Sequence, residues 1–186
     1  MVFTDDTEAV LHSAAALVNT EPGASRSDED ELTSVEDVAA FFTGWAYSGD
    51  LLRTQEELDA LRELRGELRA FFTESRDEIA EHVNRVLAES HAVPRLVRHD
   101  AYDWHVHAVP GDAPFAERIR VETAMALADL VRADETTRLK VCAADDCTAV
   151  LVDLSRNRSK RFCDVGNCGN RMNVTAYRAR RANAAG

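Results

Sequence analysis

The chain has 186 residues, of which 45% are hydrophobic and 30% are charged. This length accommodates a medium-sized domain with a smaller one attached, and the composition supports a packed core, which excludes a globally disordered chain. The sequence contains no run of about 18 apolar residues, and its first residues are acidic, so we expect neither a membrane span nor a secretory signal. We therefore expect a cytoplasmic protein without a membrane partner.

The net charge of −11 is the average of two unlike parts. Residues 1–137 carry 12 arginines against 29 acidic residues, which gives a net charge of −17. Residues 138–186 carry 10 basic residues against 4 acidic ones, which gives a net charge of +6. Such an asymmetry favours a contact between the C-terminal part and a polyanion such as nucleic acid, which the average alone would disfavour.

Helical periodicity dominates the first half of the sequence. Apolar residues recur at helical spacing in four stretches, which predict four helices over residues 11–18, 35–46, 55–72 and 79–87. Ser34 and Thr54 precede two of these stretches and are suited to cap them. The acidic segment 22–31, which begins with Pro22 and Gly23, is expected to be a solvated loop.

The periodicity changes after residue 95. Apolar and polar residues alternate from Tyr102 to Ala108, which is typical of a strand with one buried face, and residues 95–98 are a suitable antiparallel partner. A long helix is expected from Phe115 to Leu130. We therefore expect an α+β fold in which residues 1–137 form a mostly helical domain with a small β-hairpin.

The four cysteines lie close together in the sequence, as two pairs with matched spacing. Cys142 and Cys147 are separated by four residues, fifteen residues follow, and Cys163 and Cys168 are again separated by four. Thiols stay reduced in the cytoplasm, so this pattern predicts metal ligands rather than disulfides. Four thiolates complete a tetrahedral Zn²⁺ site and leave no open position, so we expect one structural zinc ion per chain.

The residues around the cysteines predict the rest of the metal-binding domain. Residues 150–154 read as a strand, 155–159 as a turn and 160–162 as a returning strand, followed by a helix that contains Cys168 in its first turn. A knuckle, a hairpin and a helix that supplies the last ligand describe a treble-clef zinc finger, which we place over residues 138–186.

At this point the sequence resembles a known family. Cys168-Gly169-Asn170-Arg171 reproduces the motif of the CGNR zinc fingers, and residues 153–163 are similar to the basic hairpin of that family, with Phe162 in place of its usual tryptophan. Residues 17–20 and 61–65 resemble signatures of the ABATE domain, which usually precedes this finger. The resemblance implies a stress-induced transcription regulator that binds DNA.

Basic residues are the candidate nucleic-acid contacts. They occur at the tip of the expected hairpin and along the C-terminal helix: Arg156, Arg158, Lys160, Arg161, Arg171, Arg178 and Arg181. This arrangement offers a phosphate backbone two places of contact. The alternative is that the same surface docks on the acidic domain or on another protein, in which case the chain is an interaction adaptor that does not bind nucleic acid.

Two polar segments of the N-terminal part are candidates for binding a small-molecule or protein signal. They are Asn19-Thr20 and the strand face that carries Asp103, His105 and His107, although the residues alone favour a solvated strand face for the latter. We find no nucleophile motif and no glycine-rich phosphate loop, so we do not expect an enzyme. The sequence therefore predicts a two-domain regulator with an N-terminal sensing or partner-binding domain and a DNA-binding zinc finger.

Overall fold

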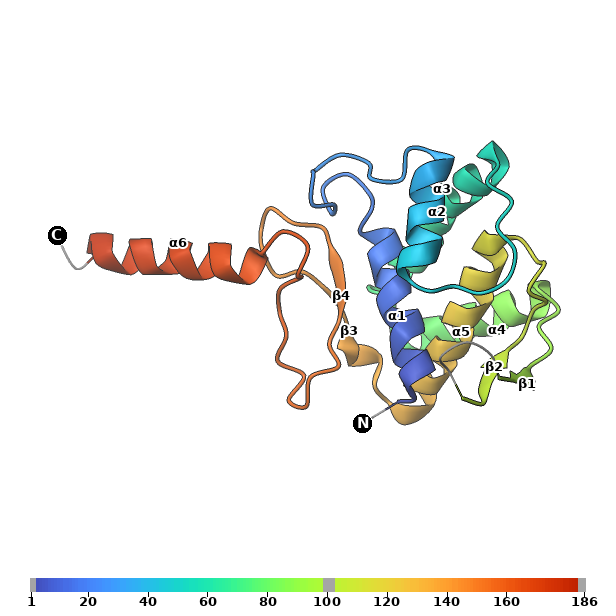
Figure 1. Cartoon of the computed structure of the whole chain (residues 1–186). Coiled ribbons are helices and arrows are strands. Elements are labelled where there is room, and N and C mark those ends of the chain that lie inside the picture. The colour runs from blue at the N-terminus through green and yellow to red at the C-terminus, as the bar shows by residue number, and fades with distance from the viewer. Residues whose placement is uncertain (1–2, 99–102, 184–186) are drawn as a thin grey trace.

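The computed structural model describes residues 3–98 and 103–183. Over these residues the chain forms six α-helices and two antiparallel sheets of two strands each (Figure 1). The helices are α1 (Asp5–Val18), α2 (Val35–Gly44), α3 (Gln55–Ala70), α4 (Arg76–Glu89), α5 (Phe115–Ala133) and α6 (Cys168–Asn183). The strands are β1 (Arg95–Val97), β2 (His105–His107), β3 (Leu139–Val141) and β4 (Val150–Val152), and a short 3₁₀ helix, Thr136–Arg138, precedes β3. The predicted α+β fold is confirmed.

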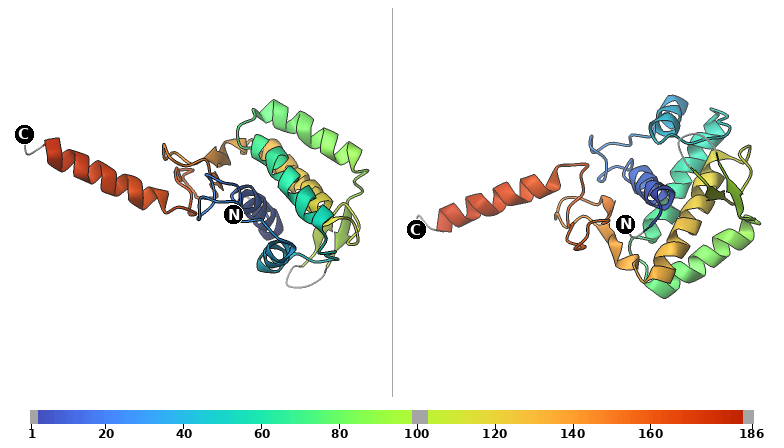
Figure 2. Two further views of the ribbon diagram at one scale, coloured as in Figure 1. Left: turned by 90° about the horizontal axis from the view of Figure 1, so that it is seen from above. Right: turned by 60° about the horizontal axis from the view of Figure 1, so that its bottom comes forward.

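Helix α5 lies at the centre of the helical body. It packs against α1, α3 and α4 (Figures 1 and 2). Its apolar side chains recur at helical spacing, and Phe115, Ile119, Leu127 and Leu130 are almost completely buried. Burial of one such side chain contributes about 1.5–3 kcal/mol to stability, so the buried face of α5 is a large contribution to the core. None of the helices over the described residues is long and apolar enough to cross a membrane.

Side-chain caps determine where α2 and α3 begin. Ser34 Oγ accepts a hydrogen bond from the Asp37 amide at 3.2 Å, and the Asp37 carboxylate accepts one from the Ser34 amide at 2.8 Å. Thr54 Oγ1 accepts from the Glu57 amide at 3.3 Å. Each cap satisfies an amide that has no partner within its helix, and such a cap contributes about 1 kcal/mol. The predicted helix starts are confirmed.

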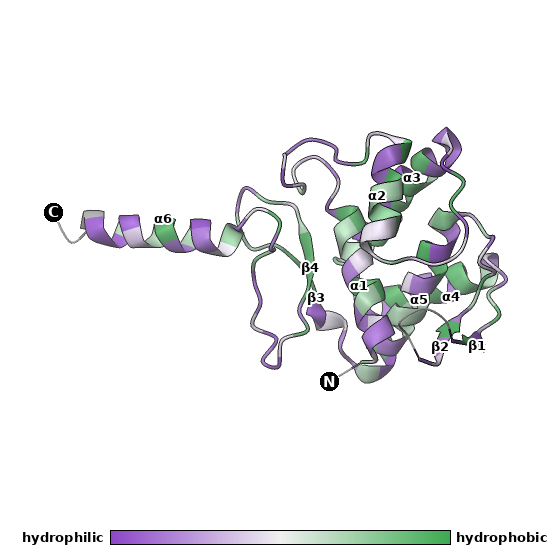
Figure 3. Cartoon of the chain, viewed as in Figure 1, coloured by the Kyte–Doolittle hydropathy of each residue, from purple (hydrophilic) through white to green (hydrophobic). Residues whose placement is uncertain are grey.

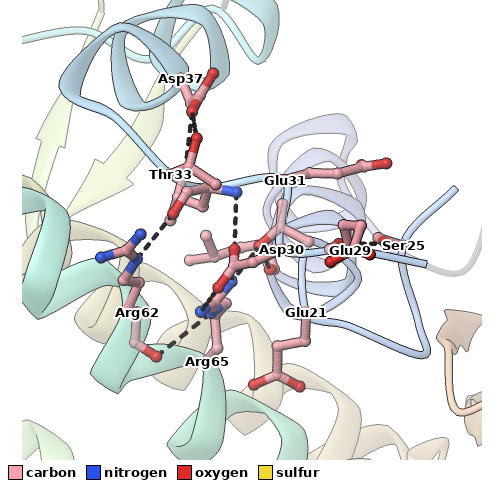
Figure 4. Close-up of polar contacts among 12 residues, drawn as sticks. Glu21, Ser25, Glu29, Asp30, Glu31, Thr33, Asp37, Arg62 and Arg65 are labelled. Carbon is pink, nitrogen blue, oxygen red and sulfur yellow. Dashed lines mark hydrogen bonds and ion pairs between the residues drawn. The ribbon is translucent and has the colours of Figure 1, made fainter. Parts of the chain in front are cut away.

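The acidic segment after α1 is attached to α3 instead of being fully solvated. Two guanidinium nitrogens of the buried Arg65 donate to the Asp30 carboxylate at 2.8 and 2.9 Å (Figure 4). The hydrogen bond from Arg65 lowers the pKa of Asp30. Arg62 Nε donates to the Leu32 carbonyl oxygen at 2.8 Å, and Leu32 itself is buried. The sequence pattern misses this attachment because the partners lie in a distant helix.

The first sheet confirms the predicted hairpin of the N-terminal part. Strand β1 pairs antiparallel with β2, and Leu96 lies opposite Val106. Both strands are shorter than the alternation suggests. Tyr102, where the predicted strand begins, lies outside the described residues. The two short strands form part of the connection between α4 and α5.

The second sheet differs from the predicted one. The sequence predicts that residues 150–154 pair with residues 160–162, and this prediction is wrong: β4 pairs antiparallel with β3 instead. Residues 160–162 are described and form no strand. Their backbone is held by other bonds, since the Lys160 amide donates to a carboxylate oxygen of Asp153 at 2.8 Å. The buried carboxylate of Asp153 therefore takes the place of the strand pairing that was expected for residues 160–162.

Strand β4 is buried on both of its faces. Val150 and Val152 belong to the main apolar core, which includes Leu17 and Val18 of α1, whereas Leu151 belongs to a smaller cluster with the cysteines. Alternate side chains of a strand point to opposite faces, so three residues contribute to two cores. The apolar packing thus runs across the boundary expected between residues 1–137 and 138–186.

Helix α6 extends away from the rest of the protein (Figures 1 and 2). Every side chain described from Asn173 to Arg181 is exposed. Most of the helix surface is hydrophilic (Figure 3), although Val174 and Tyr177 remain 40% and 54% exposed. The helix is therefore presented to solvent along most of its length.

Asn19 is a buried polar link between the helical body and the second sheet. Its amide group donates to the Val150 carbonyl oxygen and accepts from the Val150 amide, each at 2.8 Å, at the C-terminal end of α1. We expect Asn19→Ala to lower the free energy of unfolding by about 2–4 kcal/mol, because both buried groups of Val150 lose their partner. Urea denaturation of the full chain measures this.

The matched control is Asn173→Ala, which removes the same side chain from an exposed position on α6. It should change the free energy of unfolding by less than about 0.5 kcal/mol. If Asn19→Ala and Asn173→Ala had equal effects, the two hydrogen bonds would not join the parts of the protein.

Candidate metal centre and basic surface

The four cysteines come from three different segments and meet at one point. Cys142 follows β3, Cys147 precedes β4, Cys163 lies in the next loop, and Cys168 is the first residue of α6. Their sulfur atoms all lie within 4.8 Å of one another, with Cys147 to Cys163 at 3.7 Å and Cys163 to Cys168 at 3.6 Å. The structure therefore brings the four predicted ligands together.

These distances fit a tetrahedral zinc site. Zn–S bonds of about 2.3 Å place neighbouring sulfur atoms of a tetrahedron about 3.8 Å apart, close to the separations observed here. All four donors are sulfur atoms, and the set completes a four-coordinate ion without a further ligand. Zinc bound here would have a structural role, because no position remains for water or substrate.

Hydrogen bonds shape the two loops around the metal centre. The Cys142 amide donates to the Ala149 carbonyl oxygen at 2.8 Å, which closes the first loop, and the Cys163 amide donates to Cys142 Sγ at 3.4 Å. Burial raises the pKa of the Cys147 and Cys163 thiols. Burial thus opposes ionisation of these thiols. All four sulfur atoms can be ionised in this small volume only with a cation among them.

Arg171 of the CGNR motif supports the metal centre from outside. Its guanidinium group donates to Cys168 Sγ at 3.1 Å and to both carboxylate oxygens of Asp146, at 2.5 and 3.1 Å. Burial raises the pKa of Cys168, but the hydrogen bond from Arg171 and those with the other cysteines bring its pKa below the usual value. Arg171, predicted as a nucleic-acid contact, thus joins the first loop to the start of α6.

Asp153 is a second supporting residue, and sequence reasoning missed it. Its carboxylate is completely buried and accepts hydrogen bonds from Lys140 Nζ at 2.6 Å, from the Ser155 amide at 3.0 Å and from the Lys160 amide at 2.8 Å. These bonds outweigh the cost of burial and lower the pKa of Asp153 to about 2. An aspartate that ends an apolar strand is the signal that could have revealed it.

The predicted basic surface divides into paired and unpaired residues. Arg158 forms an ion pair with Glu135 at 2.7 Å and Lys160 with Asp164 at 2.6 Å, and Arg161 lies 5.8 Å from the centre of the Phe162 ring. Arg156, Arg178 and Arg181 are exposed and form no ion pair within residues 3–98 and 103–183. The loop after β4, which carries Arg156, and helix α6, which carries Arg178 and Arg181, point in different directions (Figure 1).

The structure does not bring the N-terminal candidate residues together. Asn19 bonds to β4, and Thr20 Oγ1 accepts a hydrogen bond from Arg65 at 3.1 Å. His105 and His107 instead line a cavity that neither Asn19 nor Thr20 borders. Asn19 and Thr20 therefore do not share a site with His105 and His107, and the side chain of Asn19 bonds to β4.

The fold and the metal centre define a protein with a helical N-terminal region and a C-terminal four-cysteine finger. Residues 138–181 match the CGNR zinc finger, and residues 11–134 match ABATE, described as a "putative stress-induced transcription regulator". A comparison with curated proteins gives no match. The ABATE match covers more than half of the sequence, so the chain belongs to the ABATE family, and it carries a CGNR zinc finger. The resemblance seen in the sequence is confirmed.

The buried carboxylate of Asp153 provides a test of what holds the loop before Cys163. We expect Asp153→Asn to lower the free energy of unfolding at pH 7 by about 3 kcal/mol, because Lys140 and two amides lose a charged partner in a buried place. Urea denaturation of the zinc-loaded protein measures this. The control is Asp164→Asn, whose side chain is 87% exposed and whose ion pair should contribute less than about 1 kcal/mol. Equal effects of the two substitutions would contradict this role of Asp153.

Proposed function

We propose that this protein is a DNA-binding transcriptional regulator, located in the cytoplasm, whose N-terminal region receives a signal. The observation that carries the proposal is helix α6, which projects from the metal centre and exposes unpaired arginines, among them Arg178 and Arg181. Its 16 residues span about 24 Å, and a helix of this size fits the major groove of DNA. The family description supports the same role.

The charge distribution supports the same proposal. The net charge of +6 over residues 138–186 attracts phosphate, and the net charge of −17 over residues 1–137 repels it, so DNA would contact the finger and not the body. Under this proposal the protein catalyses no reaction, and one zinc ion per chain holds the start of α6 in place. Cys168 performs this task directly, because it is both a ligand and the first residue of the helix.

The first prediction for this function concerns the metal. Metal analysis of protein purified without chelators should give one zinc ion per chain, and X-ray absorption should show sulfur neighbours only, at about 2.3 Å. Cys163→Ser should release the zinc and loosen residues 153–181, since binding contributes roughly 10 kcal/mol or more to the folding of such fingers. The helical circular dichroism of the body should persist, because Val150 and Val152 still anchor β4 in the main core.

The control for this experiment is Asp164→Asn, which changes an exposed neighbour of Cys163 and should leave zinc content unchanged. Complete unfolding of the Cys163→Ser protein would show that the body cannot hold its structure without the metal. Zinc-free wild-type protein with an ordered α6 would contradict the structural role of the ion.

The second prediction concerns DNA. Zinc-loaded full-length protein should bind duplex DNA with an affinity that falls linearly on a log–log salt plot, with a slope of about −0.9 for each phosphate contact. The double substitution Arg178→Ala and Arg181→Ala should flatten the slope by about two units if both residues contact phosphate. Arg158→Ala should have a smaller effect, because Glu135 already neutralises this guanidinium. Fluorescence anisotropy with labelled genomic fragments measures the three affinities.

The control is Arg132→Ala, which removes an exposed arginine from α5 of the acidic body and should leave the slope unchanged. Absence of salt-sensitive affinity for any nucleic acid would replace this proposal with the adaptor function. An effect of Arg132→Ala as large as that of the double substitution would place the DNA on the helical body instead of on α6.

A further inference from the structure

A cavity lies in the helical body, and none of the four cysteines borders it. Residues of α1, α5 and β2 and the segment that follows α2 enclose a volume of about 530 Å³. Cavities of this size bind small ligands in many proteins. Its wall is mostly apolar and includes Val10 of α1, Val106 of β2 and Met125 of α5. The wall alone therefore favours a molecule with a large apolar part.

Both tryptophans of the chain, Trp45 and Trp104, also border this cavity. They are 38% and 63% exposed, although tryptophan is on average a highly buried residue. Trp104 already attracts a cation, since the guanidinium carbon of Arg98 lies 5.5 Å from the centre of its ring. The face of an indole ring attracts cations, and it also stacks on other aromatic rings. The two tryptophans therefore favour a ligand that is aromatic, positively charged, or both.

The charged groups of the lining distinguish between these classes of ligand. Among the residues that the structure describes, three acids, Asp6, Glu122 and Asp129, border the cavity against one guanidinium group, that of Arg132. These four side chains together carry a net charge of −2. The Arg132 side chain is 81% exposed and already forms an ion pair with Asp129 at 3.4 Å. The charges of Asp6 and Glu122 therefore remain to attract a cation.

Two histidines of the lining, His105 and His107, do not reverse this sign. Their Nε2 atoms are 3.0 Å apart, which is a hydrogen-bond distance, and the ring that accepts in such a bond has no hydrogen on that nitrogen and is neutral. The pair therefore carries at most one positive charge. A carboxylate oxygen of Glu122 lies 2.9 Å from His107 Nδ1, and because a carboxylate accepts several hydrogen bonds, Glu122 can still accept one from a ligand.

We propose that this cavity binds a small aromatic cation, a compound with fused rings and one positively charged nitrogen. Its rings fill the apolar space and contact the tryptophans, and its charge lies within reach of Glu122, whose side chain is only 12% exposed. A carboxylate that is largely withdrawn from water attracts a cation more strongly than an exposed one, because the local dielectric constant is lower. A neutral ring system gains only the apolar contacts, and an anion is repelled by the acidic lining.

The location of this site gives it a path to the finger. Helix α1 lines the cavity with Thr7, Val10 and Ser13, and Asn19 at the C-terminal end of this helix bonds to β4. A cation bound in the cavity thus contacts the helix that supports the zinc finger. This consequence rests on the proposed function, in which the N-terminal region receives a signal, and it gives that signal a chemical class. The binding of the cation itself does not depend on it.

The binding test compares N-methylacridinium with its neutral parent acridine, two flat probes that differ by one methyl group and one positive charge. It uses the full-length, zinc-loaded protein at pH 8 without DNA. Isothermal titration calorimetry should show one N-methylacridinium per chain, bound about tenfold more tightly than acridine, because only the cation is attracted to Glu122 and to the indole faces. Tryptophan fluorescence should change along the same saturation curve, since both tryptophans border the cavity. Acridine binding as tightly as the cation, or no binding of the cation, would overturn the proposal.

Three substitutions locate the bound cation. Glu122→Gln keeps the shape of the side chain but removes its charge, so the affinity for N-methylacridinium should fall about tenfold while that for acridine changes little. Trp104→Ala truncates an exposed side chain and should weaken the binding of both probes, which keeps the test decisive if Glu122→Gln disturbs the fold. The matched control is Glu117→Gln, the same change on the same helix but outside the cavity lining, and it should leave both affinities unchanged.

Binding of the cation that survives both Glu122→Gln and Trp104→Ala would contradict the site, and so would an equal loss in the Glu117→Gln protein. Since DNA is absent from every measurement, failure here leaves the DNA-binding proposal unaffected. Conversely, a protein that binds the cation in this cavity but no nucleic acid would keep the ligand site and lose the proposed function.

Discussion

The structure depends on one short strand that serves two cores. Val150 and Val152 of β4 complete the apolar face of α1, while Leu151 completes the cluster around the cysteines. Both faces of the strand are buried. A shift by one residue would therefore move the side chains of each core into the other. The metal centre, the start of α6 and the helical body therefore have fixed positions relative to β4.

Much of this architecture could be predicted from the sequence because it follows local rules. Helix caps at Ser34 and Thr54, the alternation around Val106 and the spacing of the cysteines each involve residues close together in the chain. Local patterns of this kind determine which elements form and which side chains bind metal. They also sufficed to place Cys168 in the first turn of the last helix, as the structure shows.

The remaining features could not be predicted because they depend on residues far apart. The sequence pairs 150–154 with 160–162, since nothing local reveals that β3 is the better partner or that Asp153 holds the returning segment. Arg171 and Arg158 appear as free cations in the sequence, yet Asp146 and Glu135 bind them. Likewise, Glu122, whose carboxylate lies 2.9 Å from His107 Nδ1, lies in another element.

The double role of β4 has a consequence for how the protein is made. Asn19 and its partner Val150 are separated by 131 positions in the sequence, so α1 leaves the ribosome long before the strand that covers it. Domains fold as synthesis proceeds, and until residue 150 appears the helical body has an open apolar side. A chain that stopped before β4 would keep this apolar surface exposed, and such surfaces are what chaperones and proteases act on. A body that is stably folded therefore already includes β4, and with it the segment through which it is proposed to act.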